Sequence, residues 1–178
     1  MPMTVATAIG AAALVLAVGC GGGYDNTGPS GNSNPCTISI TGAAAIAGTY
    51  NCSTTPITVW VPSTNSTAVN VSSSGTKSIV GLFVFAGKPT AGATYNSANS
   101  AGLQSYGFVV NIGTATWEFS AGQQLTPLGS GTLTFTTVAP LGSNANGSVY
   151  DAHGTMDANL VPSPGTTATG NATLHVVF

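Results

Sequence analysis

Residues 36–52 read CTISITGAAAIAGTYNC, two alternating runs that are joined by small residues and closed by a cysteine at each end. If the runs pair as a hairpin about the centre of the segment, Cys36 lies opposite Cys52 and Ile38 lies opposite Tyr50. These side chains then share one face, because side chains alternate along a strand. Opposed residues have Cα atoms about 4.5 to 5.5 Å apart, a separation that a disulfide spans. The segment therefore predicts a Cys36–Cys52 disulfide, and the alternative is a pair of buried free thiols.

The chain after this hairpin repeats short alternating runs separated by Gly, Pro, Asn and Ser. Residues 78–86 are almost continuously apolar, which is typical of a strand covered on both sides. No sustained helical period accompanies these runs. We therefore expect an all-β fold, either an antiparallel β-sandwich or a small β-barrel of about eight to ten strands. The other expected inward-facing sets are Ile57, Val59 and Val61; Phe108, Val110 and Ile112; Ala115, Trp117 and Phe119; and Leu133 and Phe135.

Residues 1–19 form an uncharged apolar leader, which is shorter than the roughly 20 residues that a membrane-spanning helix needs. It ends in small residues, as a cleaved signal peptide does. The motif Ala17-Val18-Gly19-Cys20 resembles the lipobox of bacterial lipoproteins. This resemblance implies that residues 1–19 are a signal peptide and that Cys20 carries lipid. The alternatives are an ordinary signal peptide and an uncleaved anchor helix.

Residues 21–35 read GGGYDNTGPSGNSNP and contain almost nothing to bury. Such a composition is typical of a flexible tether, with a root-mean-square span of about 20 Å. The alternative is that it packs on the domain through Tyr24. The expected organisation is therefore a signal peptide over residues 1–19, a lipidated Cys20 with a tether over 20–35, and a β-rich domain over 36–178.

At the level of the whole chain, the pattern resembles small β-rich lipoproteins of the Gram-negative envelope. It consists of the lipobox, the Gly-rich tether, the GTYNC run ending at Cys52, the HGTMDA run starting at His153 and a terminal Phe178. With Gly21 after the lipobox cysteine, the resemblance implies a lipid anchor in the bacterial outer membrane, with the domain in the periplasm or at the cell surface. It brings no catalytic residues.

Charge is scarce in this chain: charged residues make up 3% and the net charge is −2. Without a basic cluster, the sequence lacks the electrostatic footprint of a nucleic-acid-binding protein. Expected partners are the membrane, through the lipid anchor, and an envelope protein or glycan. No cofactor is expected.

The last two runs, with a turn at residues 161–165, predict a hairpin that gathers both histidines and two of the four acidic residues of the chain. Pairing about Pro164 sets His153 opposite His175 on the outer face, with Asp151 two residues away and Asp157 opposite Asn171. Opposed side chains have Cβ atoms about 4.5 to 5.5 Å apart, so the two imidazoles and Asp151 could bind Zn²⁺ or Cu²⁺. The alternative is that both histidines are ordinary solvated side chains.

Three aromatic residues suggest a ligand-binding surface. Trp60 is expected to point away from its alternating valine neighbours, where it could stack on a sugar or anchor a protein partner. The alternative is that it fills a second core layer. Tyr95 and Tyr106 flank an Asn- and Ser-rich segment that could form a rim.

Acid–base chemistry has little support in the sequence. Glu118, next to Trp117, has no carboxylate partner nearby, so a glycosidase pair cannot be argued. The sequence therefore predicts a non-enzymatic structural or binding module of the bacterial envelope. The alternative is a carbohydrate-binding or metal-dependent activity, such as that of a hydrolase, centred on the C-terminal hairpin.

Overall fold

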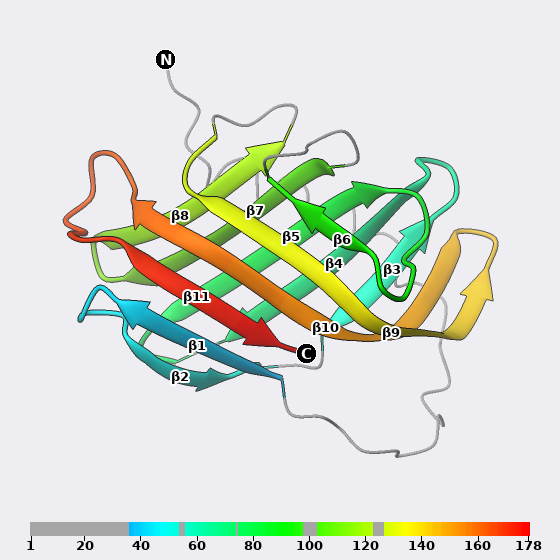
Figure 1. Cartoon of the computed structure of the whole chain (residues 1–178), viewed down its shortest axis with the longest axis horizontal. Helices are drawn as coiled ribbons and strands as arrows, with labels where there is room; N and C mark the ends of the chain where they lie inside the picture. Colours follow the sequence, from blue (N-terminus) through cyan, green and yellow to red (C-terminus); the bar gives the residue numbers. More distant parts are fainter. Residues whose placement is uncertain (1–35, 54–55, 74, 98–102, 123–126) are drawn as a thin grey trace. The chain divides into compact units, whose positions relative to one another are not determined.

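The computed structural model describes residues 36–53, 56–73, 75–97, 103–122 and 127–178. This part of the chain is all-β, and its eleven antiparallel strands belong to one hydrogen-bonded sheet (Figure 1). No helix in these ranges is long and apolar enough to cross a membrane. The predicted leader, Cys20 and tether lie outside the described residues. The strands are β1 (Thr37–Gly42), β2 (Gly48–Asn51), β3 (Ile57–Val61), β4 (Ser66–Ser73), β5 (Ser78–Ala86), β6 (Thr94–Asn96), β7 (Leu103–Ile112), β8 (Ala115–Gly122), β9 (Ser130–Asn144), β10 (Gly147–Pro162) and β11 (Ala172–Val177).

The strands of the domain lie in two layers that cross each other (Figure 1). One layer has the order β2-β1-β11-β10-β9-β6, and the other has the order β3-β4-β5-β7-β8. Strand β10 joins them, because residues 148–150 pair with β3 and residues 161–162 pair with β8. The path of paired strands from β10 through β3, β4, β5, β7 and β8 therefore returns to β10.

The core lies between these layers and consists of the inward-facing sets that alternate along each strand. The ring of Phe85 on β5 lies 5.8 Å from that of Phe135 on β9, so the two layers meet through aromatic contacts. Fully burying a side chain of this size contributes about 1.5 to 3 kcal/mol. The predicted inward residues that are at most 2% exposed are Phe108, Val110, Trp117, Phe119, Leu133 and Phe135.

The predicted disulfide hairpin is confirmed. Ile38 pairs with Tyr50 between β1 and β2, and the Cα atoms of Cys36 and Cys52 are 5.3 Å apart across the disulfide. The backbone N–H of Cys52 also donates a hydrogen bond to the carbonyl of Cys36. Because disulfides persist in oxidising compartments, this bridge indicates an extracytoplasmic protein.

Strand β3 presents the opposite face to the one predicted. Ile57 is 55% exposed, whereas Thr58 is fully buried and pairs with buried Val69 of β4. The prediction was wrong because both faces of β3 carry apolar side chains, so periodicity does not identify the inner one. Pairing with β4 places Thr58 and Trp60 on the inner face, and a shift of one residue reverses every side chain of a strand.

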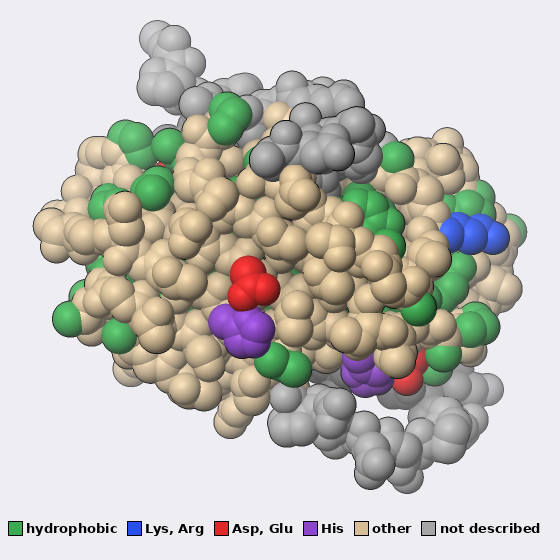
Figure 2. Space-filling model, in the orientation of Figure 1, with side chains coloured by type: hydrophobic (Ala, Val, Ile, Leu, Met, Phe, Trp, Pro, Cys, Tyr) green, Lys and Arg blue, Asp and Glu red, His purple; other side chains and the backbone are tan. Residues whose placement is uncertain are grey.

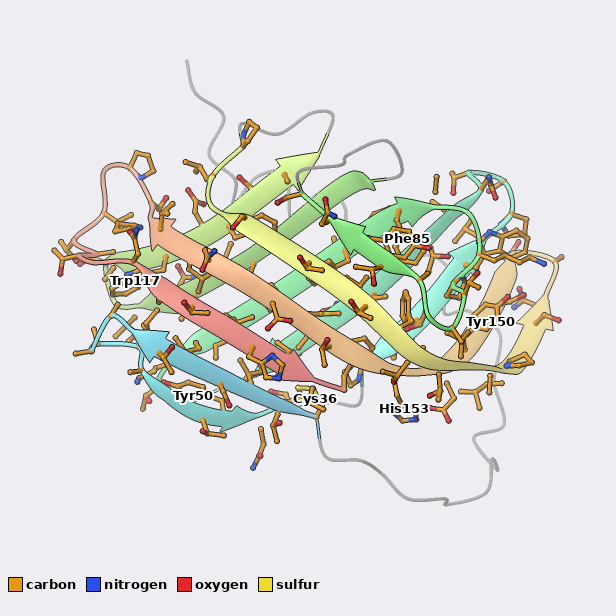
Figure 3. All side chains as sticks on the ribbon, in the orientation of Figure 1. Cys36, Tyr50, Phe85, Trp117, Tyr150 and His153 are labelled. Atoms are coloured by element: carbon orange, nitrogen blue, oxygen red, sulfur yellow. A yellow bond between two sulfur atoms is a disulfide. The ribbon has the colours of Figure 1, made fainter. Side chains whose placement is uncertain are left out.

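The predicted register of the last hairpin was also wrong. The structure pairs Met156 with Val176, and β10 continues to Pro162. The strand extends past the predicted turn because residues 163–171 pack on the start of β8, where Trp117 Nε1 donates a hydrogen bond of 2.9 Å to the carbonyl of Gly170 (Figure 3). The shift is an even number of residues, so the predicted inner face is retained.

Candidate functional site

The two histidines of the C-terminal hairpin lie in separate His–Asp pairs. Asp157, rather than His153, lies opposite His175, and its Oδ1 atom is 2.6 Å from His175 Nδ1. His153 instead lies beside Asp151 on its own strand, with 3.2 Å between Nε2 and Oδ1. Figure 2 shows these two places, where acidic and histidine side chains touch, on a face of otherwise mostly uncharged side chains.

This arrangement does not form the predicted metal site. His153 and Asp157 are four residues apart on β10, which corresponds to about 13 Å along a strand. His175, opposite Asp157, is therefore remote from the pair formed by His153 and Asp151. Within the described ranges, no three His, Cys, Asp or Glu side chains are grouped so that they could hold a metal ion.

Trp60 is not an exposed stacking platform. It lies half-buried on the inner face of β3, beside the fully buried Thr67 of β4. The Nζ atom of Lys88 lies 4.4 Å from the centroid of the Trp60 ring, which is a cation–π contact. Lys88 therefore occupies a place on the Trp60 ring where a sugar would stack.

The predicted tyrosine rim is not assembled from described side chains. The ring of Tyr95 packs 4.2 Å from that of Phe85 and meets Phe135 edge-on. Burial raises the pKa of Tyr95 above its usual value of 10.0, since the charged phenolate loses hydration. The backbone of Tyr106 pairs within β7, but its side chain lies outside the described part of the structure.

Glu118 is 4% exposed, which is unusual for a carboxylate. Its Oε1 atom accepts a hydrogen bond of 2.8 Å from the Ser163 hydroxyl, and its backbone pairs with that of Val161. The carboxylate therefore binds the start of the connection between β10 and β11. This geometry describes a structural contact, because the side chain is enclosed and hydrogen-bonded to Ser163.

A groove on the outer surface lies where β6, β9, β10 and β11 run side by side. It is open to solvent and has a volume of about 350 Å³. Its floor lies over the paired residues Gly131 and Ala158, which are both buried and small. The polar residues that line it are Asn96, Ser97, Thr132, Asp157, Asn159 and Thr173, together with Ser130.

Hydrogen bonds hold these polar side chains in place. Asn159 donates from Nδ2 to the Ser130 hydroxyl at 2.9 Å, and the hydroxyl of Thr173 approaches its Oδ1 atom at 3.5 Å. On the β6 side, the hydroxyl of Ser97 accepts a hydrogen bond of 3.0 Å from the backbone N–H of Gly131. The groove therefore has a preorganised wall of hydroxyl and amide groups.

One row of paired residues runs from this wall across four strands. Asn96, Thr132, Asp157 and His175 occupy directly paired positions on β6, β9, β10 and β11. Sequence reasoning singled out Asp157 and His175 but placed each opposite the wrong residue. An outward polar face of β9 can be recognised from the alternation of Ser130, Thr132 and Thr134. Nothing in the local sequence, however, predicts that this face lies beside Asn96.

Comparison with protein-family models, curated proteins and solved structures finds no match to this chain.

Proposed function

We propose that this protein is a lipid-anchored binding module of the bacterial envelope, held in the outer membrane through Cys20. The lipobox-like sequence before Cys20 and the Cys36–Cys52 disulfide both support a location outside the cytoplasm. Several acyl chains would retain the protein on the membrane, since each buried methylene contributes about 0.8 kcal/mol.

The observation that carries the binding role is the open groove of β6, β9, β10 and β11, which is lined mainly by Asn, Ser and Thr residues. Its lining side chains lie on paired strands and several are already hydrogen-bonded to one another or to the backbone, so little further ordering is required when a ligand binds. The groove faces outward on the domain, where an envelope protein or glycan can reach it.

Two measurements test this proposal. Intact mass with lipid extraction, on protein purified from its native membrane, should give a species that begins at Cys20 and carries acyl mass. Replacement of Cys20 by Ala should move the protein to the soluble fraction. An unmodified chain in the membrane fraction would contradict the anchor.

The binding role is tested by co-sedimentation of the soluble Cys20→Ala variant with washed cell envelopes, since the acyl chains of the parent protein would sediment with the membrane by themselves. We expect saturable binding that is reduced when residues of the groove are replaced. Failure to sediment with envelopes at any protein concentration would contradict a role as an envelope-binding module.

A further inference from the structure

The chemistry of the groove restricts the ligand that it can take. Among its lining residues, Asp157 is the only one with a formal charge, and Lys77 and Lys88 are the only Lys or Arg of the whole chain. Neither lysine lines the groove, since Lys77 lies on Tyr50 and Lys88 on Trp60. A phosphate, sulfate or uronate would therefore meet the Asp157 carboxylate in a groove that has no Lys or Arg to bind it.

The remaining groups of the groove both donate and accept hydrogen bonds. Asn96 and Asn159 present amides, and Thr132 and Thr173 present hydroxyls, from four adjacent strands. Each amide has two donors and an acceptor, and each hydroxyl has one donor and two lone pairs. Adjacent strands are about 4.8 Å apart, so these groups form a grid whose spacing is close to the span of a sugar ring.

We infer that this groove binds a neutral saccharide, which deepens the proposed binding function and depends on it. Ligand hydroxyls donate to the Asp157 carboxylate and exchange hydrogen bonds with the Asn96 and Asn159 amides. Gly131 and Ala158, which are paired beneath the groove, face the core, so only the backbone of β9 and β10 lies between the outward side chains there.

His175 is a positioning residue in this scheme. Its Nδ1 atom holds Oδ1 of Asp157 at 2.6 Å, and His175 itself is not among the residues that line the groove. A carboxylate offers about four lone-pair sites, so Asp157 retains acceptor capacity for a ligand after this contact.

The test is calorimetric titration of the full protein, purified from its native membrane in detergent. The probes are neutral hexasaccharides of glucose, mannose, galactose and N-acetylglucosamine, hexagalacturonate as the charged comparator, and the neutral glycan fraction released from the same envelopes. We expect at least one neutral probe to bind, and hexagalacturonate to bind at least about tenfold more weakly than it.

Asp157→Asn and Asn159→Ala should each weaken binding of that probe by about tenfold, because each removes hydrogen bonds to the ligand. Asp151→Asn is the matched control, since it removes the same charge from the same strand outside the groove, and it should leave the affinity unchanged. His175→Gln should weaken binding less than Asp157→Asn does.

Three results would overturn the inference. They are wild-type affinity in both groove variants, stronger binding of hexagalacturonate than of every neutral probe, and no binding of any neutral probe including the released glycans. If the Cys20→Ala variant still sediments with envelopes in these cases, the binding module stands and only the saccharide assignment fails. If envelope binding is also lost, the proposed function fails with it.

Discussion

The Oδ1 atom of Asp157 on β10 lies 2.6 Å from Nδ1 of His175, directly across the pair that β10 forms with β11. Both side chains are about half exposed, at 54% and 47%. An ion pair or charged hydrogen bond at this exposure contributes only about 0 to 1 kcal/mol to stability, because water competes for both partners. The pair therefore matters more for the orientation of the carboxylate than for the stability of the fold.

We predict that Asp157→Asn lowers the free energy of unfolding by less than about 1 kcal/mol. Urea unfolding followed by tryptophan fluorescence measures this difference. A loss above about 2 kcal/mol would indicate that Asp157 stabilises the sheet, and would make Asn159→Ala the better variant for the binding experiment.

Reduction of the Cys36–Cys52 bridge should lower the free energy of unfolding by about 3 kcal/mol. The two cysteines are 16 residues apart, and opening a loop of that size releases conformational entropy in the unfolded chain. Urea unfolding with and without reductant measures the effect. A variant in which both cysteines are replaced by Ala serves as the control, since reductant should leave its midpoint unchanged.

Thr58 and Thr67 form a matched pair of fully buried threonines on neighbouring strands. Thr67 donates a hydrogen bond of 2.6 Å to the carbonyl of Gly87, whereas the Thr58 hydroxyl has no hydrogen-bond partner in the described structure. We therefore expect Thr58→Val to raise the free energy of unfolding by about 1 kcal/mol, because it removes a buried polar group that gains nothing from folding.

Thr67→Val should have the opposite effect and lower the free energy of unfolding by about 1 to 2 kcal/mol, because the Gly87 carbonyl loses the hydroxyl that donates a hydrogen bond to it. Chemical unfolding of both variants beside the parent protein gives the comparison. Equal destabilisation by the two changes would show that the Thr58 hydroxyl is hydrogen-bonded in solution.

Alkaline pH should destabilise the domain through Tyr95. Burial raises the pKa of Tyr95 in the folded protein above its usual value of 10.0, so the folded state holds this proton more tightly than the unfolded chain does. Its contribution to stability is fully present below about pH 10 and is lost as the pH rises through the folded-state pKa. The unfolding midpoint, followed from pH 8 to 11.5, should fall over this window.

Tyr95→Phe keeps the ring packed on Phe85 but removes the ionisable group. The variant should lose less stability between pH 9 and 11.5 than the parent protein. Identical alkaline profiles for the two proteins would mean that other groups cause the loss. Absorbance of the tyrosinate band in the folded protein gives an independent measure of the titration.

Local sequence was sufficient for much of the fold. The positions of Cys36 and Cys52 predict the register of β1 against β2. The loop between these strands is short, and pairing about its centre places the alternating side chains of both strands on one shared face. The buried faces of β7 and β8 were also predictable from the sequence, because Phe108 and Phe119 belong to strands with one clearly apolar face.

The face of β3 and the register of the last hairpin required the tertiary structure. Ile57 and Trp60 lie on opposite faces of a strand that is apolar on both, so only its pairing with β4 decides which face is buried. The turn between β10 and β11 lies later in the chain than predicted, because residues 161–162 pair with β8. The residues of β8 in this pairing lie more than forty positions earlier in the sequence.

The sequence by itself determined the strand periodicity, the disulfide hairpin and the scarcity of charge, because these properties depend on neighbouring residues or on composition. Only the tertiary structure decided that Asn96, Thr132, Asp157 and His175 form one row. The physical reason is that side-chain alternation is a property of a single strand. The order and register of strands distant in sequence, in contrast, depend on which pairing buries the most apolar surface and satisfies the most hydrogen bonds across the whole sheet.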